Sequence, residues 1–326
     1  MRVGILGAGA MGAVHAAAWA RLPDVEIAGI AGRTPGRATA LAARFGARPF
    51  TDATTLLDDD TIDAVDVTTP TASHRELVLA ALARGKHVLC ETPLASELAD
   101  VDAMIAAARR SDALLQVALL SRVAQPGTQV RGWLRAGVFG SPLVLSFARL
   151  WPGLAQLDDP EDHHGDALEE VSLFDIDYLV WCFGLPRSVT ASAARAGRQA
   201  VAHVTTMLDL GDVRAVVEGS VALPSSFAFR IGARVVCEDG TIEWLVRFAA
   251  NGPPVVELAR YPRRGEPERV QAPEENPYEA ECARFAGVVR GVAEPDLLGA
   301  EAARDGLLVV AAARESLRSG GPVPVG

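Results

Sequence analysis

The sequence predicts an α/β protein, in which a doubly wound parallel sheet is followed by an α+β domain with a large open, mostly antiparallel sheet. Strand-like and helix-like stretches alternate through the first third of the chain, the pattern of a parallel sheet. From about residue 143, long strands separated by short turns dominate instead. A chain of 326 residues is long enough for two domains. We expect them at residues 1–121 and 122–326, with the option that the C-terminal helices pack back on the first domain.

The first strand and helix carry the strongest signal. An apolar run at 2–6 leads directly into the glycine-rich segment 7–12, and a helix-like stretch at 13–21 follows. G-x-G-x-x-G between a strand and a helix is typical of dinucleotide binding, because its glycines allow a tight turn, a close approach of the pyrophosphate and close helix packing. The helix N-terminus then presents free N–H groups to the phosphates. We assign the phosphates to five turn residues: Gly7, Gly9, Ala10, Met11 and Gly12.

The end of the second strand, residues 25–30, indicates which dinucleotide is preferred. An NAD site usually places an acidic residue here to bind the ribose 2′-hydroxyl. No carboxylate stands between Ala28 and Arg37, and Arg33 and Thr34 occupy the turn instead. A guanidinium and a hydroxyl suit a 2′-phosphate, so the sequence favours NADP(H) over NAD(H). The alternative is that Arg33 only stacks on the adenine, which would leave the preference open.

The other elements follow in order. In the first domain the periodicity predicts helices at 36–45, 53–57, 73–84 and 95–110 and strands at 47–50, 64–68, 86–91 and 114–120. In the second domain a helix at 168–183 follows the first strand and precedes the others, and helices at 278–292 and 299–318 close the chain. The strands of the second domain are expected at 143–150, 188–196, 201–210, 213–223, 228–238, 241–246 and 255–261. A broad sheet face can pack against another subunit, so we expect a homodimer or homotetramer.

Composition excludes several classes of function. Thirty-one basic and 41 acidic residues give a net charge of −10 without a basic patch, which argues against nucleic acid or anionic membranes as partners. No apolar run reaches the roughly 20 residues that span a bilayer. The four cysteines form no C-x-x-C pair, which predicts reduced thiols in a cytoplasmic protein without a metal site.

Several segments together resemble the glucose–fructose oxidoreductase/inositol dehydrogenase (Gfo/Idh/MocA) family. They are the glycine turn, T-T-P at 68–70 with His74, G-K-H-V-L-C-E-T-P at 85–93, W-L-R-A-G-V-F-G before residue 141, and 165–184. The resemblance implies a Rossmann domain and an open-faced sheet domain, with a sugar-like substrate bound at the nicotinamide between them. It adds six residues to the cofactor site: Thr68, Thr69, Pro70, His74, Glu91 and Pro93.

The departures from the family pattern concern proton transfer. The family's lysine position is Thr92, which cannot titrate near neutral pH. Lys86, the only lysine, lies at the opposite end of the same strand, so we expect a structural role for it. The family's second signature has an Asp where this chain has Glu170 and a His where it has Phe174, and it keeps Asp177. These last three positions, i, i+4 and i+7, share one face of a helix.

Two interpretations follow. In the first, the enzyme is an NADP(H)-dependent oxidoreductase acting on a C–O or C=N centre of a sugar-like or natural-product intermediate. The replacement proton carrier is then Glu170, Asp177 or His164 (or its neighbour His163), with Thr92 at the catalytic position. Substrate contacts are expected from Arg122, Phe174 and Trp151. In the second, the protein is a dinucleotide-binding sensor without catalysis, or a redox-neutral enzyme that retains its cofactor. Free exchange of cofactor would indicate the sensor, and purification with cofactor bound the redox-neutral enzyme.

Overall fold

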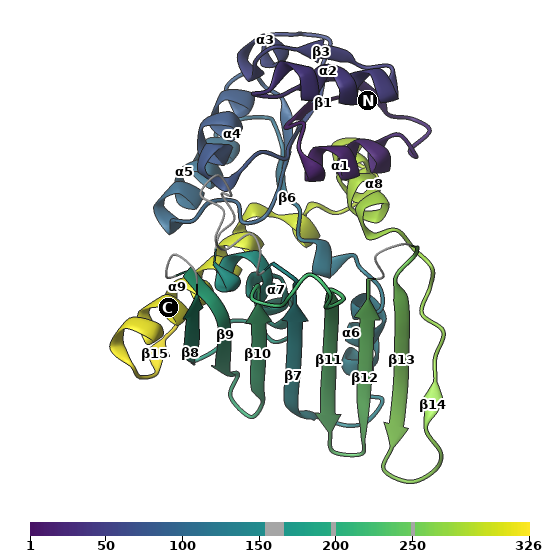
Figure 1. Ribbon diagram of the computed structural model, residues 1–326, viewed down its shortest axis with the longest axis vertical. Helices are drawn as coiled ribbons and strands as arrows, with labels where there is room; N and C mark the ends of the chain where they lie inside the picture. Colours follow the sequence, from purple (N-terminus) through teal and green to yellow (C-terminus); the bar gives the residue numbers. More distant parts are fainter. Residues whose placement is uncertain (154–165, 197–199, 249–251) are drawn as a thin grey trace. The chain divides into compact units, whose positions relative to one another are not determined.

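The computed structural model describes residues 1–153, 166–196, 200–248 and 252–326 (Figure 1). The chain divides into two compact units. The first contains residues 1–123 and 275–304, and the second contains residues 124–274 and 305–326. The first unit is thus discontinuous in sequence, because a C-terminal segment returns to it.

The first unit is built on a six-stranded sheet whose strand pairs are all parallel. The strand order β3-β2-β1-β4-β5-β6 reverses direction between β1 and β4, the topological switch point at which such sheets bind ligands. This confirms the predicted doubly wound sheet. The strands are β1 (Arg2–Leu6), β2 (Glu26–Ala31), β3 (Arg48–Phe50), β4 (Ala64–Val67), β5 (His87–Cys90) and β6 (Leu115–Val117).

Helices pack around this sheet. Trp19 of α1 and Phe285 of α8 are fully buried and meet edge to face, with ring centroids 6.0 Å apart. Buried aromatic pairs of this kind contribute about 0.5–1.5 kcal/mol beyond their area, so α8 is an integral part of the core. The helices are α1 (Ala10–Trp19), α2 (Pro35–Phe45), α3 (Ala53–Leu57), α4 (His74–Leu82), α5 (Leu98–Arg109) and α8 (Pro277–Val289).

The predicted strand at 114–120 is shorter in the structure. It ends at Val117, and a 3₁₀ turn, Leu120–Arg122, takes the place of its last residues. The physical reason is that only Ala118 continues the ladder, donating its N–H to Cys90 O at 2.8 Å. Further 3₁₀ turns at Thr71–Ser73 and Pro295–Leu298 complete the connections of this unit.

The second unit contains a nine-stranded sheet of order β14-β13-β12-β11-β7-β10-β9-β8-β15. Every pair in it is antiparallel except β7 with β10. This confirms the expected open, mostly antiparallel sheet. Its strands are β7 (Pro142–Leu150), β8 (Ser188–Ala196), β9 (Ala200–Asp209), β10 (Arg214–Ser220), β11 (Arg230–Cys237), β12 (Gly240–Arg247), β13 (Val255–Pro262), β14 (Glu268–Arg269) and β15 (Val323–Pro324).

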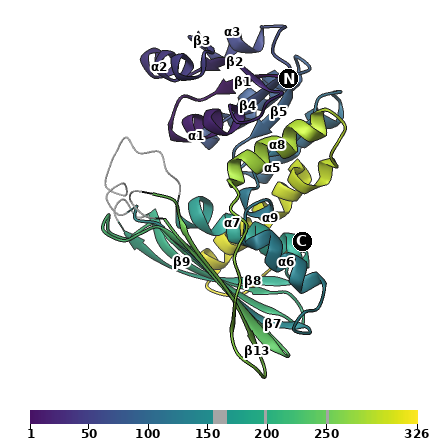
Figure 2. The same cartoon turned by 90° about the vertical axis from the view of Figure 1, so that its right-hand side faces the viewer.

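Helices cover one face of this sheet. Figure 2 shows α6 (Gly127–Arg135), α7 (Leu173–Phe183) and α9 (Ala300–Ser319) on the same side. Alternate side chains of the strands bury against them, and Phe147 of β7 has its ring centroid 5.5 Å from those of both Tyr178 and Trp244. The other face carries no helix of the described chain. None of the described helices combines the length and the apolarity that crossing a membrane requires.

Candidate functional site

The glycine turn at 7–12 has the geometry that the motif predicts. Gly7 adopts φ +130°, a conformation that favours glycine. A Cβ on Gly12 would lie 1.9 Å from Gly7 O, so close packing of α1 on the turn requires the absence of a side chain. A Cβ on Gly9, in contrast, would meet no protein atom within 4 Å. The space at Gly9 is therefore open, as a pyrophosphate approaching the backbone requires.

The N-terminus of α1 is prepared for an anion. Gly9 is its N-cap residue and supplies no side-chain cap, and the first turn contains no acidic residue. The N–H groups of that turn and the positive end of the helix dipole therefore point toward the open space at Gly9. This turn fits a dinucleotide pyrophosphate, which the backbone N–H groups of residues 9–12 would hold.

The end of β2 lies beside the same turn, because Gly7 N donates to Ala31 O at 2.9 Å. Arg33, Thr34 and Arg37 follow β2 and are all exposed. No ion pair engages either arginine within the described ranges, so both guanidinium groups are available to a ligand. They lie where a Rossmann fold places the adenosine ribose.

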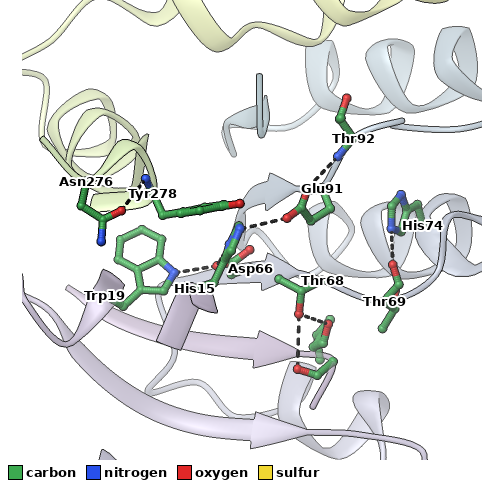
Figure 3. Close-up of polar contacts among 12 residues, drawn as sticks. His15, Trp19, Asp66, Thr68, Thr69, His74, Glu91, Thr92, Asn276 and Tyr278 are labelled. Atoms are coloured by element: carbon green, nitrogen blue, oxygen red, sulfur yellow. Dashed lines mark hydrogen bonds and ion pairs between the residues drawn. The ribbon is translucent and has the colours of Figure 1, made fainter. Parts of the chain in front are cut away.

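The loops after β4 and β5 border the turn from the other side (Figure 3). Thr68 covers the turn, with its Oγ1 3.3 Å from Gly7 O. His74 is buried between two loops, with Nε2 2.7 Å from Thr69 O and Nδ1 3.0 Å from Pro93 O. Burial lowers the pKa of His74. A neutral ring carries one N–H and donates to one of these two carbonyl oxygens, while the ring itself packs between the two loops. The Thr92–Pro93 peptide is cis.

A buried polar cluster links α1, β4 and β5 (Figure 3). His15 is fully buried, with Nδ1 2.8 Å from Asp66 Oδ2 and Nε2 2.9 Å from Glu91 Oε1. Trp19 Nε1 donates to the same Asp66 oxygen at 2.6 Å. Burial alone lowers the pKa of His15, but the charges and hydrogen bonds of Asp66 and Glu91 outweigh it and raise this pKa well above its ordinary value.

Helix α8 adds a third acid to the cluster. Glu281 is fully buried, and neither of its carboxyl oxygens has a hydrogen-bond partner in the described part of the chain. Burial raises its pKa well above the ordinary value, and the negative charges of Glu91 and Asp66 add to this effect, while His15 opposes it. The neighbouring Tyr278 ring lies over His15, with centroids 5.8 Å apart.

Sequence reasoning missed this cluster. One signal was present, since Asp66 interrupts an otherwise apolar strand that is buried at every position, and a buried carboxylate requires a partner. The identity of its partners could not be read from the chain, because His15 and Trp19 lie on α1, 51 and 47 residues before Asp66.

Lys86 has the structural role that we predicted for it. Its Nζ donates to the carbonyl oxygens of Asp59 and Ile62, at 2.8 Å each, and the residue is 5% exposed. It thus ties the start of β5 to the loop before β4, at the end of the sheet opposite the glycine turn.

In the second unit, the helix predicted at 168–183 begins as a π-helix, Leu168–Ser172, before α7. Glu170 and Phe174 are partly exposed on it. Asp177 is only 2% exposed, and its Oδ1 lies 3.6 Å from where a Cβ on Gly306 of α9 would be. The three positions are therefore not equally accessible, because α9 covers the last of them.

Two ion pairs beside these residues were not anticipated. Arg149 of β7 donates to buried Asp175 at 2.7 Å, and its guanidinium lies 4.9 Å from the centroid of Phe174. Burial raises the pKa of Asp175, and Arg149 opposes that shift. Glu169 pairs with Arg314 of α9. Burial raises the pKa of Glu169 and Arg314 lowers it, with a net rise.

The remaining predicted substrate residues have mixed environments. Arg122 is 5% exposed and donates to Leu297 O at 3.3 Å, so it belongs to the interior of the first unit. Trp151 follows β7, is partly exposed, and donates its backbone N–H to Ser220 O at 2.8 Å. His163 and His164 lie outside the described residues. Among the residues that are described, no group of three or more His, Cys, Asp or Glu side chains could hold a metal ion.

Known proteins resemble this chain in sequence and in fold. The model of a family described as "Oxidoreductase family, NAD-binding Rossmann fold" matches residues 1–119. Inositol 2-dehydrogenase from Acidothermus cellulolyticus is 31% identical to the chain over 98% of its length and 93% of the relative's length. The match to this relative thus extends through both units.

Solved structures show the same fold. UDP-N-acetylglucosamine 3-dehydrogenase from Acidithiobacillus ferrooxidans superimposes with a TM-score of 0.81 at 26% identity, covering 98% of each chain. Aldose-aldose oxidoreductase from Caulobacter crescentus gives a TM-score of 0.86 at 20% identity, covering 99% of each chain. The second likeness bears on the fold alone.

Proposed function

The chain belongs to the Gfo/Idh/MocA family of oxidoreductases with an NAD-binding Rossmann fold, and we propose that it transfers a hydride between NADP(H) and a carbon that bears a hydroxyl or carbonyl group on a sugar-like substrate. The observation that carries this proposal is the open space at Gly9, next to an anion-ready helix N-terminus. When bound, the nicotinamide accepts or supplies the hydride. The protein holds its pyrophosphate at residues 9–12 and its ribose near Thr34.

The proposed preference for NADP(H) rests on Arg33, Thr34 and Arg37. All three are exposed beside the turn, and a 2′-phosphate would gain charge-assisted hydrogen bonds from the guanidinium groups. A ribose 2′-hydroxyl would lack the acidic partner that it has in NAD-specific sites.

Arg33→Ala should raise the dissociation constant of NADPH by roughly tenfold, the loss of one charge-assisted hydrogen bond of about 1.5 kcal/mol. The dissociation constant of NADH should change by less than about twofold, because NADH has no 2′-phosphate. Nicotinamide fluorescence in a titration of each cofactor measures both constants. The control is Arg110→Ala, which removes an exposed arginine at the end of α5. An equal loss for both cofactors would contradict the role of Arg33.

For the proton that accompanies hydride transfer we propose Glu170. It is a carboxyl group at the family's acidic position and is partly exposed, whereas Asp177 is covered by α9. Phe174 supplies no proton, and Thr92 does not titrate near neutral pH. A carbonyl or imine that needs little acid assistance suits this set of residues.

Substitution of Glu170 by Gln should lower kcat by about 10²- to 10⁴-fold, the usual contribution of a general acid or base, and flatten the pH–rate profile. The substrate is sought by assaying NADP⁺ reduction with inositol and UDP-N-acetylglucosamine, the substrates that the relatives' names indicate. Asp177→Asn is the matched control. An unchanged pH profile in Glu170→Gln would exclude this carboxyl group as the proton carrier.

We also propose that the protein is a cytoplasmic homodimer or homotetramer associated through the helix-free face of the nine-stranded sheet. Val144 and Met207 project from this face and are 41% and 54% exposed. None of the four cysteines forms a disulfide, as a reducing compartment would require. Light scattering of the purified protein gives the mass of the assembly.

A further inference from the structure

His15 lies between two carboxyl groups, one at each ring nitrogen. Nδ1 lies 2.8 Å from Asp66 and Nε2 lies 2.9 Å from Glu91, and the imidazole has no exposed surface. An ionised carboxylate only accepts, and a neutral imidazole carries one N–H. Nδ1 is hydrogen-bonded to Asp66, whereas Nε2 lies within ion-pair distance of Glu91 without hydrogen-bond geometry. An imidazolium is the form of the ring that both acids attract. Trp19 Nε1 donates to the same Asp66 oxygen at 2.6 Å, so a second contact fixes this acid.

Glu91 connects the His15 ring to the end of β5, beside the candidate cofactor site. Glu91 places Oε1 toward His15, while its Oε2 accepts the backbone N–H of Thr92 at 3.1 Å (Figure 3). Thr92 occupies the position after β5 at which parallel sheets bind their ligands. A continuous set of contacts thus runs from α1, which holds the pyrophosphate, through His15 and Glu91 to the Thr92 backbone.

We propose that His15 is a positioning residue for the nicotinamide, because its contacts fix Glu91 and, through Glu91, the backbone of Thr92. This inference rests on the proposed dinucleotide binding. Loss of the cation would leave Glu91 free to rotate away from Thr92 N, and the strand end would lose one of its constraints. The adenine half of the cofactor, bound near Arg33, does not contact this chain of residues.

The other titratable groups around His15 support its charged state. Asp66 comes from β4, Cys90 and Glu91 from β5, and Tyr278, Glu281 and Cys282 from α8. Burial raises the pKa of both thiols and of Glu281, so these three groups stay neutral. Asp66 and Glu91 remain as the two acids within ion-pair distance of the ring nitrogens.

The test compares NADPH with 2′,5′-ADP, a cofactor fragment that lacks the nicotinamide. His15→Gln should raise the dissociation constant of NADPH about tenfold or more, since small errors in position are costly at such sites, and should leave that of 2′,5′-ADP within about twofold. Glu91→Gln removes the ion pair with His15 by changing a residue that is partly exposed. It should likewise raise the dissociation constant of NADPH and leave that of 2′,5′-ADP nearly unchanged. In the double variant the two effects should not add, because both remove one contact. The control is His203→Gln, on β9 of the second unit.

The pH dependence gives a second readout. Because the pKa of His15 is raised, the wild-type affinity for NADPH should be constant up to neutral pH and fall as alkaline pH removes the proton. The affinity of His15→Gln should lack this alkaline fall. Equal losses for NADPH and 2′,5′-ADP in both variants, or additive losses in the double variant, would overturn the positioning role. If the wild-type protein binds neither NADPH nor NADH, the proposed function fails as well, and this inference fails with it.

Discussion

Gly9→Ala is expected to weaken NADPH binding by roughly 100-fold while leaving the fold intact. The new methyl group meets no protein atom within 4 Å, and Gly9 has φ −87°, which alanine adopts without strain. It would instead occupy the space that the pyrophosphate needs. Loss of two charge-assisted hydrogen bonds of about 1.5 kcal/mol each corresponds to this factor. Fluorescence titration gives the affinity, and thermal unfolding gives the stability.

The matched control is Gly132→Ala. Gly132 lies within α6 of the second unit, and a Cβ there also meets nothing within 4 Å. Alanine in a helix interior is favoured over glycine by roughly 1 kcal/mol, so this variant should be slightly more stable and bind NADPH normally. If Gly9→Ala bound NADPH as tightly as the wild type, the turn would not be the phosphate site.

Replacement of Glu281 by Gln should remove a pH-dependent loss of stability. The folded protein keeps this buried carboxyl group protonated, because its pKa is raised, whereas the unfolded chain releases the proton near its ordinary pKa. Above that ordinary value the unfolded state binds fewer protons, so the free energy of unfolding falls as pH rises, by about 1.4 kcal/mol per pH unit, until the folded pKa is reached. Glutamine does not titrate, so the free energy of unfolding of Glu281→Gln lacks this fall with pH.

Urea unfolding over a series of pH values measures the effect. Relative to the wild type, Glu281→Gln should gain stability progressively from mildly acidic to alkaline pH. His15, whose pKa is also raised, contributes stability that is lost as pH rises through its folded pKa, so part of the wild-type slope should remain. Glu76→Gln, an exposed change on α4, is the control. Parallel stability curves for Glu281→Gln and the wild type would show that this carboxyl group is not held neutral.

The sequence was most informative where local pattern determines structure. Apolar periodicity predicted the sheets and their helices, and the spacing of Gly7, Gly9 and Gly12 predicted a turn whose geometry the structure confirms. The strands β14 and β15 were missed because two residues carry no periodicity. The parallel pairing of β7 with β10 was missed because sequence alternation does not reveal the neighbour of a strand.

The polar interior was predictable only in part. His15, Asp66, Glu91 and Glu281 come from α1, β4, β5 and α8, and only the tertiary fold brings these elements together. Residues 170, 174 and 177 were expected to share one accessible helix face, but two features that sequence spacing does not reveal change their exposure. A π-helix occupies Leu168–Ser172, and α9 covers Asp177.

The most direct test of the account is a fluorescence titration of the purified protein with NADPH, repeated with NADH. Exposed Arg33 and Arg37 beside an acid-free turn predict that NADPH binds at least about tenfold more tightly, the value of one charge-assisted hydrogen bond. Tighter binding of NADH would contradict the assignment of the 2′-phosphate site. Binding of neither cofactor would contradict the central claim that this chain is a dinucleotide-dependent oxidoreductase.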